Sequence, residues 1–222
     1  MAKKPRVIHT CTECGYSSPK WLGRCPECGS WGTLQEEAPA ASGPVKTSSL
    51  TPSAPASPIT KVEAAATKTV KSGIRELDRV LGSGVVPGSV VLMAGEPGVG
   101  KSTLLLEVAS RWAKQGRKAL YVTAEESAGQ VRARAERTEA LMDTLYLAAE
   151  SNLDVVFGHV EQLKPSLLIV DSVQTMHAAG VEGVAGGVAQ SRAVTAALTT
   201  LAKTTNIPVL LVGHVTKDGN VA

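Results

Sequence analysis

The chain has 222 residues, which is enough for one full-sized domain and a small module, and its hydrophobic content of 43% suits a globular core. No apolar run is long enough to cross a membrane, and the basic start MAKKPR is not followed by the apolar stretch of a secretory signal. The formal net charge is only +3, so bulk charge gives almost no support for nucleic-acid binding. We therefore expect a cytoplasmic protein without membrane association, in which thiols stay reduced.

Four cysteines lie close together near the start of the chain. Two Cys-x2-Cys pairs are separated by ten residues, and a glycine that permits a tight turn follows each pair. This spacing is typical of a tetrahedral Zn²⁺ site, and we predict a zinc ribbon over residues 1–34. We expect Trp21 and Trp31 to pack against its small core rather than stack on bases. Whether the ribbon contacts DNA or protein is left open. The predicted zinc ligands are Cys11, Cys14, Cys25 and Cys28.

Residues 35–70 differ in composition from the segments on either side. They are dominated by Ala, Pro, Ser and Thr and show no apolar periodicity. Such a stretch buries too little apolar surface to offset the entropy lost on ordering. We interpret it as a flexible linker.

Residues 71–222 alternate between apolar runs and helical patterns. Strands are expected at 89–95, 118–126, 145–149, 167–172 and 208–214. Helices are expected over 102–116 and over roughly 189–205. A third helix is expected to start near Ser127 as its N-cap, and a fourth to run from a cap at Asn152 or Asp154 to Leu163. Strands that are almost continuously Val, Leu and Ile indicate a parallel sheet covered on both faces. The predicted class is therefore α/β.

The stretch GEPGVGKST follows one predicted strand and opens a helix. It matches the phosphate-loop pattern G-x-x-x-x-G-K-[ST] in the context that the pattern requires. Glycines let backbone N–H groups converge on phosphate oxygens, the lysine reaches the β- and γ-phosphates, and the serine hydroxyl ligates Mg²⁺. The predicted nucleotide-binding residues are Gly95, Glu96, Pro97, Gly98, Val99, Gly100, Lys101, Ser102 and Thr103.

Carboxylates follow two other predicted strands. The run LLIV ends in Asp171, where a buried strand would deliver a carboxylate to the Mg²⁺ shell together with Ser102. Hydrolysis also needs a group that activates water, and Glu125 and Glu126 end the strand YVTAEE. We favour Glu125 as the catalytic carboxylate, although an acidic pair that merely opens the next helix would look the same.

Four stretches together resemble a known family: CTECGYSSPKWLGRCPECGSWGTL, SGIRELDRVLGSGVVPGSVVLMAGEPGVGKST, YVTAEES and LLIVDSVQT. In this order they resemble the RadA (Sms) family of bacterial DNA-repair ATPases. The resemblance implies a RecA-like P-loop ATPase core behind a zinc ribbon, with ATP, Mg²⁺ and Zn²⁺ as cofactors. It further implies a homo-hexameric, helicase-like motor on single-stranded DNA that promotes branch migration of recombination intermediates, with a recombinase or a replicative helicase as partner.

The same resemblance implies roles for single residues. Lys101 contacts the phosphates of the nucleotide, Asp171 helps to hold its Mg²⁺, and Glu125 is the catalytic carboxylate. His214, at the end of the strand PVLLVGH, senses the γ-phosphate. An ordinary strand-end histidine is the alternative for His214. The segment 172–192 resembles a DNA-binding loop, in which Arg192, together with Lys217 beyond it, could contact phosphates. The arginines of the helix after Ser127 are expected on a solvated face: Arg132, Arg134 and Arg137.

The chain departs from the family pattern at three places. Ser83 and Ala124 stand where the family usually has glycine. The chain also stops at Ala222, before the family's KNRFG motif and Lon-protease-like domain. We therefore expect a fragment with a core that is incomplete at its carboxyl end.

Two other classes of function remain open. One is an adaptor in which ATP switches the affinity for DNA or protein while hydrolysis is slow. The other is a phosphotransferase of the nucleotide-kinase type, which shares the phosphate loop but would need an arginine-rich lid that is not evident in the sequence.

Overall fold

The computed structural model describes residues 8–37, 58–61 and 68–214. Contacts within the chain divide it into two compact units, Met1–Thr67 and Lys68–Ala222. Most of the predicted linker, residues 38–57 and 62–67, lies outside the described residues, apart from a single turn of 3-10 helix, η1 (Ile59–Lys61). No helix in the described ranges is long and apolar enough to span a membrane.

The first unit contains a small antiparallel sheet. Strand β1 (Ile8–Cys11) pairs with β2 (Ser17–Ser18) on one side and with β3 (Leu34–Glu37) on the other. Strand β3 therefore continues three residues past the predicted end of the ribbon at residue 34. Among the described residues of this unit, the buried hydrophobic side chains are Cys11, Cys25 and Leu34, and Ser18 is buried as well.

The expected packing of the ribbon tryptophans is wrong. Trp21 is 60% exposed and Trp31 is 76% exposed. The half-buried neighbours of the ribbon core are instead the smaller side chains of Cys14, Tyr16 and Leu22. A unit of about thirty residues has too little interior to hide two indole rings.

The second unit is built on a five-stranded parallel sheet, as predicted. Its strand order is β4-β8-β7-β5-β6. All five predicted strands are confirmed, as β4 (Val90–Gly95), β5 (Ala119–Thr123), β6 (Leu145–Ala149), β7 (Leu167–Asp171) and β8 (Val209–His214). Strand β5 ends earlier than expected because the chain bends after Thr123, whose hydroxyl accepts a hydrogen bond from the Glu126 amide at 3.1 Å.

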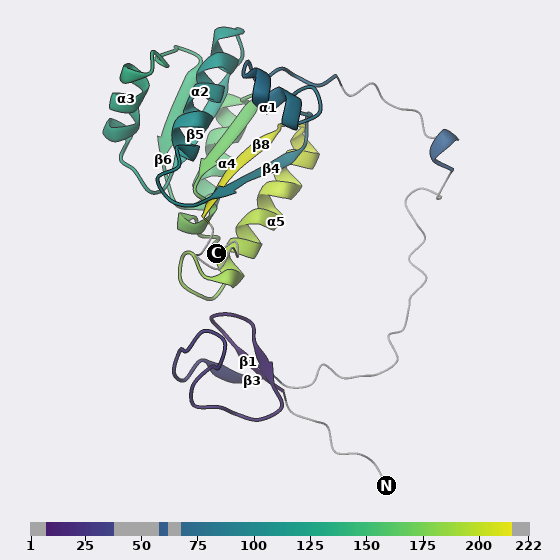
Figure 1. Cartoon of the computed structure of the whole chain (residues 1–222), viewed down its shortest axis with the longest axis vertical. Coiled ribbons are helices and arrows are strands. Elements are labelled where there is room, and N and C mark those ends of the chain that lie inside the picture. Colours follow the sequence, from purple (N-terminus) through teal and green to yellow (C-terminus); the bar gives the residue numbers. More distant parts are fainter. Residues whose placement is uncertain (1–7, 38–57, 62–67, 215–222) are drawn as a thin grey trace. The chain divides into compact units, whose positions relative to one another are not determined.

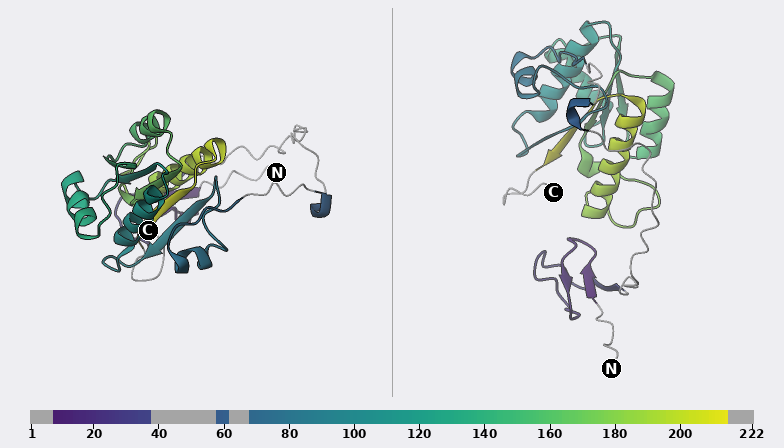
Figure 2. Two further views of the ribbon diagram at one scale, coloured as in Figure 1. Left: turned by 90° about the horizontal axis from the view of Figure 1, so that it is seen from above. Right: turned by 90° about the vertical axis from the view of Figure 1, so that its right-hand side faces the viewer.

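Helices cover both faces of this sheet (Figure 1 and Figure 2). On one face α2 (Lys101–Lys114) and α3 (Ala128–Arg137) pack on the strands, with α1 (Arg75–Val80) beside them. On the other face lie α4 (Leu153–Leu163) and α5 (Val188–Thr205). Strand side chains alternate between the faces: Tyr121 and Ile169 face α2, while Val122 and Val170 lie in the opposite core.

The helix starts follow the predicted capping signals. Ser127 caps α3 in a complete capping box with Gln130. Asn152, rather than Asp154, caps α4, because its side chain accepts a hydrogen bond from the Asp154 amide at 2.9 Å. These caps fix where each helix begins after the strand that precedes it.

Candidate nucleotide-binding site and metal centre

The carboxyl ends of neighbouring strands bring the predicted nucleotide residues to one edge of the sheet. Gly95, the last residue of β4, is paired with His214 at the end of β8. Thr123, the last residue of β5, is paired with Asp171 at the end of β7. Open α/β sheets bind their ligands at this edge, and residues more than a hundred positions apart in sequence meet there.

The loop between β4 and α2 has the backbone expected of a phosphate cradle. Gly98 and Gly100 adopt φ values of 82° and 91°, which L side chains rarely adopt. A Cβ atom added to either glycine would meet no atom within 4 Å, so space lies open above the loop. The predicted binding residues Glu96, Pro97 and Val99 complete this exposed loop. Helix α2 then begins at Lys101 with no side-chain cap on its N–H groups, which leaves them to an anion.

Lys101 lies folded over this loop. Its side chain is buried, and Nζ donates hydrogen bonds of 2.8 Å to the carbonyl oxygens of both Gly95 and Glu96. The ammonium group is thus held at the phosphate loop rather than extended into solvent. Ser102 and Thr103 follow it in the first turn of α2.

Asp171 is held by a buried tyrosine. The Tyr121 hydroxyl donates to Asp171 Oδ2 at 2.6 Å and lies 3.5 Å from the Ser102 carbonyl oxygen. Burial, followed by the charge of Asp171 and the hydrogen bond to it, raises the pKa of Tyr121 far above its ordinary value. The phenol therefore stays protonated and remains a donor. The two predicted magnesium residues, Ser102 and Asp171, therefore lie on either side of one hydroxyl group, that of Tyr121.

The two adjacent glutamates have different partners. Ser172 donates a short hydrogen bond to Oε1 of Glu125, and Nε2 of His214 lies 3.0 Å from the same oxygen. Glu126 instead forms an ion pair with Arg134 of α3. Although burial lowers the pKa of Arg134, the hydrogen bond and charge of Glu126 raise it above its ordinary value. Glu125 therefore faces the strand ends, and Glu126 ties the loop to α3.

The arginine cluster of α3 departs from the expected solvated face at one position. The Arg134 side chain is only 13% exposed, because its guanidinium turns inward to Glu126. Arg132 and Arg137 are exposed, as expected. Nothing in the local charge pattern distinguishes Arg134 from its neighbours. The ion pair between Arg134 and Glu126 depends on the bend after β5, which the sequence does not show.

Three further side chains at the site were not predicted from the sequence: Tyr121, Ser172 and Arg134. Ser172 follows Asp171 directly, so its position at the strand end was available as a signal. Tyr121 lies inside an apolar strand, where an aromatic residue usually signifies core packing. Its hydroxyl reaches Asp171 from the neighbouring strand, which only the strand order establishes.

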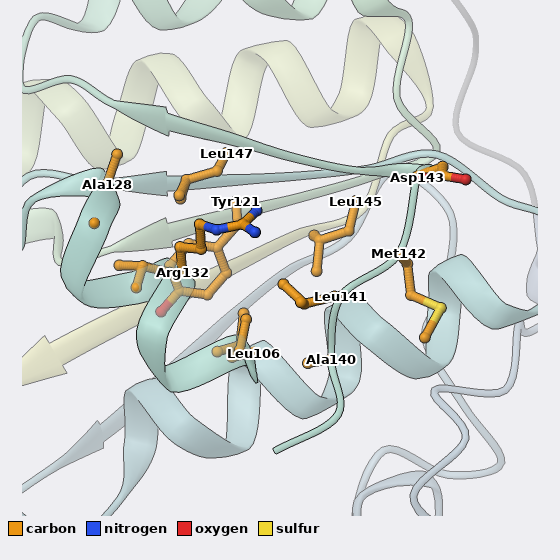
Figure 3. A pocket seen from close by; sticks show the side chains of 13 residues that line it. Leu106, Tyr121, Ala128, Arg132, Ala140, Leu141, Met142, Asp143, Leu145 and Leu147 are labelled. Atoms are coloured by element: carbon orange, nitrogen blue, oxygen red, sulfur yellow. The ribbon is translucent and has the colours of Figure 1, made fainter. Parts of the chain in front are cut away.

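Tyr121 also lines a cavity of about 430 Å³ on the α2–α3 face of the sheet (Figure 3). The other lining residues include Leu106, Leu145, Leu147 and Arg132. The walls are mainly aliphatic, and the phosphate loop contributes nothing to them. We therefore assign the nucleotide to the strand ends and not to this cavity.

The predicted DNA loops are described only in part. Segment 172–192 contains a turn of 3-10 helix, η2 (Val173–Thr175), and the first five residues of α5, the last of which is Arg192. The continuation after His214, including Lys217, lies outside the described residues. Contact with DNA therefore remains a prediction for both segments.

The four cysteines of the first unit form a candidate metal centre. Their Sγ atoms all lie within 4.8 Å of one another, with 3.7 Å between Cys11 and Cys28 and 3.5 Å between Cys14 and Cys25. Four thiolates at about 2.3 Å from one tetrahedral Zn²⁺ would be about 3.8 Å apart. The cluster therefore fits a single zinc ion.

The thiols of this cluster have shifted pKa values. Burial raises the pKa of Cys14 to about 12. Burial also acts to raise the pKa of Cys11, but hydrogen bonds with Thr33 and with the backbone outweigh it and lower the pKa to about 6. A hydrogen bond with Ser30 lowers the pKa of Cys28. Two of the thiols thus favour the thiolate form that ligates metal.

Comparison with known proteins agrees with both units. Residues 55–220 match the family model described as AAA domain, and residues 9–36 match the rubredoxin metal binding domain. The chain is 53% identical over 228 residues to a Mycolicibacterium smegmatis protein named DNA repair protein RadA, covering 99% of this chain and 49% of that protein. Proteins of the same name are 56% identical in Mycobacterium tuberculosis, over 98% of this chain and 46% of the relative, and 41% identical in Bacillus subtilis, over 99% and 49%.

The chain thus spans about half the length of the curated relatives that it matches. The family model covers most of the second unit, including the phosphate loop, Glu125, Asp171 and His214. The chain belongs to the AAA domain family, and nearly its whole length is similar to proteins named DNA repair protein RadA.

Proposed function

We propose that this chain is the nucleotide-hydrolysing part of a DNA-repair ATPase. The observation that carries the proposal is the meeting of an open phosphate loop with two carboxylates and a histidine at one edge of a parallel sheet. The names of the relatives supply the link to DNA repair.

ATP would bind over the loop 95–103. The loop and the start of α2 supply backbone N–H groups, and phosphate oxygens would compete with the carbonyls of Gly95 and Glu96 for the Lys101 ammonium. Ser102 and Asp171 would hold Mg²⁺, which would supply positive charge to neutralise the charge that develops on the phosphate oxygens. Tyr121 fixes the orientation of the Asp171 carboxylate.

Glu125 is the residue that we assign to activating water. Both of its contacts use Oε1, so Oε2 is the oxygen that would accept a proton from the attacking water. His214 bridges from this carboxylate to the end of β8, beside the phosphate loop. It could therefore report the state of the γ-phosphate to the chain that follows β8.

The full activity that we propose is a helicase-like motor on single-stranded DNA, which promotes branch migration of recombination intermediates. Segment 172–192 and the chain after His214 would contact DNA, and zinc would hold the ribbon together. A homo-hexameric ring and a recombinase or replicative-helicase partner belong to the same proposal. The competing function is an adaptor in which ATP switches DNA affinity and hydrolysis is slow.

Paired substitutions test the assignment of Glu125. Glu125→Gln should lower ATP hydrolysis on the order of 10²- to 10⁴-fold, because it removes the proton acceptor, while the affinity for nucleotide changes little. Glu126→Gln is the matched control: the amide oxygen can still accept a hydrogen bond from Arg134, and the rate should fall less than about threefold because the assigned proton acceptor is unchanged. If the two variants lose activity equally, or if Glu126→Gln loses more, the assignment is wrong.

A second measurement separates the motor from the adaptor. ATP and GTP hydrolysis are measured with and without single-stranded DNA. A motor requires DNA to accelerate hydrolysis, and Lys101→Ala should abolish that acceleration. Slow hydrolysis that DNA leaves unchanged, together with ATP-dependent DNA affinity, would instead favour the adaptor.

A further inference from the structure

Two tryptophans stand exposed side by side on the ribbon. Trp21 and Trp31 are 60% and 76% exposed. A Cβ atom added to Gly23 would lie 3.7 Å from Cη2 of Trp21 and 3.8 Å from Cζ3 of Trp31, so both six-membered rings lie against the backbone of this glycine. Two adjacent indole rings on the surface of so small a unit form an exposed apolar patch, and such patches commonly mark a site of interaction with another molecule.

The backbone around these rings is tightly hydrogen-bonded. Arg24 and Trp31 form an antiparallel bridge, and the Gly32 amide donates to the Gly23 carbonyl at 2.9 Å. The amide of Cys25 donates to the Ser30 carbonyl, also at 2.9 Å. These bonds hold the backbone of Trp31 and of Gly23, and the Trp21 ring lies beside Gly23. The rings are presented by a fixed frame, which lowers the entropy lost when a ligand binds.

Cationic groups accompany the rings. The Arg24 guanidinium lies over Trp31, 5.9 Å from the ring centroid, while its Nε donates to the Gly29 carbonyl at 2.9 Å. Lys20 directly precedes Trp21. Within residues 8–37 these are the only Lys or Arg residues, and the ion pairs found in the described ranges include neither of them. The Lys20 ammonium and the remaining N–H groups of Arg24 are therefore available to an anionic partner.

We propose that Trp21 and Trp31 form a stacking platform for unpaired bases of single-stranded DNA, with Lys20 and Arg24 contacting the adjoining phosphates. Exposed aromatic rings next to cations are how proteins hold single strands without regard to sequence, because every base offers a π face. A purely apolar peptide would leave both cations unmatched. This inference rests on the proposed action on DNA and names a second place where the strand would bind.

Intrinsic fluorescence gives a local test, because the chain has only three tryptophans and Trp112 is buried in the second unit, where it donates to Ser166. The zinc-loaded chain is titrated with oligodeoxythymidine in the absence of nucleotide. Stacking should quench the emission of Trp21 and Trp31. Trp112→Phe should retain the quenching, whereas the double variant Trp21→Phe/Trp31→Phe, in which only Trp112 emits, should lose it.

Affinity completes the test. The double variant Trp21→Ala/Trp31→Ala should bind the oligonucleotide at least about fivefold more weakly, and the double phenylalanine variant should lie between it and the parent. Bound zinc is measured in each variant to verify that the ribbon is folded. Lys101→Ala should abolish hydrolysis and keep the quenching, which separates this proposal from the proposed function.

Three outcomes would overturn the proposal: quenching absent from the parent chain, equal affinity in the zinc-loaded double alanine variant, or equal quenching by a blunt duplex whose bases are paired. The first two would reassign the rings to a protein partner. The third would reduce the contact to charge alone.

Discussion

At the scale of single residues, the hydroxyl of Tyr121 joins elements that are distant in sequence. It donates to Asp171 on β7 and lies near the Ser102 carbonyl on α2. Asp171 itself is buried, so this phenol sets which way the carboxylate points. A hydrogen bond to a charged group typically contributes about 1.5–3 kcal/mol.

Removing the Tyr121 hydroxyl should lower the apparent affinity of the site for Mg²⁺. In Tyr121→Phe the Asp171 carboxylate loses its donor, so we expect the Mg²⁺ concentration for half-maximal ATP hydrolysis to rise about tenfold or more. We also expect the free energy of unfolding to fall by about 1–3 kcal/mol, as measured by denaturant titration. Tyr146→Phe is the matched control, since Tyr146 lies on the edge strand β6. An unchanged Mg²⁺ requirement in Tyr121→Phe would contradict the positioning role.

At the scale of secondary structure, much of the second unit was predictable because its signals are local. Apolar runs mark the five strands, and Ser127 and Asn152 cap helices where the sequence indicates. Other features depend on contacts that local patterns do not contain. The separate partners of Glu125 and Glu126 follow from the strand order and from the position of α3. The exposure of Trp21 and Trp31 follows from the limited interior of the ribbon.

The turn after α1 contains a residue under backbone strain. Gly82, Ser83 and Gly84 all have positive φ, at 70°, 105° and 136°. Ser83 is the only one of the three with a Cβ atom. Its backbone N–H donates a hydrogen bond of 2.8 Å to the Asp78 carbonyl oxygen, which holds it in place. A residue with a side chain in this backbone region typically destabilises the folded state by about 1–3 kcal/mol. Glycine would remove this strain, but its greater freedom in the unfolded chain would offset part of the gain.

Ser83→Gly should therefore stabilise the second unit by about 1 kcal/mol, measured as an upward shift of the thermal or denaturant midpoint. Ser83→Ala keeps the Cβ atom and serves as the control, with no gain expected. Equal stabilisation by both substitutions would show that strain at this position is not the cause.

At the scale of the whole molecule, the chain consists of two compact units with separate cores. We expect the ribbon to depend on its metal, because in residues 8–37 the hydrophobic cluster has three buried side chains and a few half-buried neighbours. The α/β unit has two large apolar layers, one on each face of the sheet. We therefore expect the two units to fold independently.

Deleting residues 1–67 should leave the α/β unit intact. Its thermal midpoint, followed by far-ultraviolet circular dichroism, should change by less than about 2 °C, and basal ATP hydrolysis should be preserved. Zinc removal by a chelator should give the same result while it unfolds the ribbon. A fall of more than about 5 °C on deletion would show that the α/β unit requires the ribbon for its stability.

The central claim is that a magnesium nucleotide binds where the phosphate loop meets Asp171. The most direct measurement is a crystal structure of the chain with Mg²⁺ and a nonhydrolysable ATP analogue. We predict phosphates over residues 95–103, Lys101 turned from the carbonyls of Gly95 and Glu96 to the phosphates, and magnesium between Ser102 and Asp171. An analogue bound away from this loop, or a magnesium ion that neither Ser102 nor Asp171 approaches, would contradict the account.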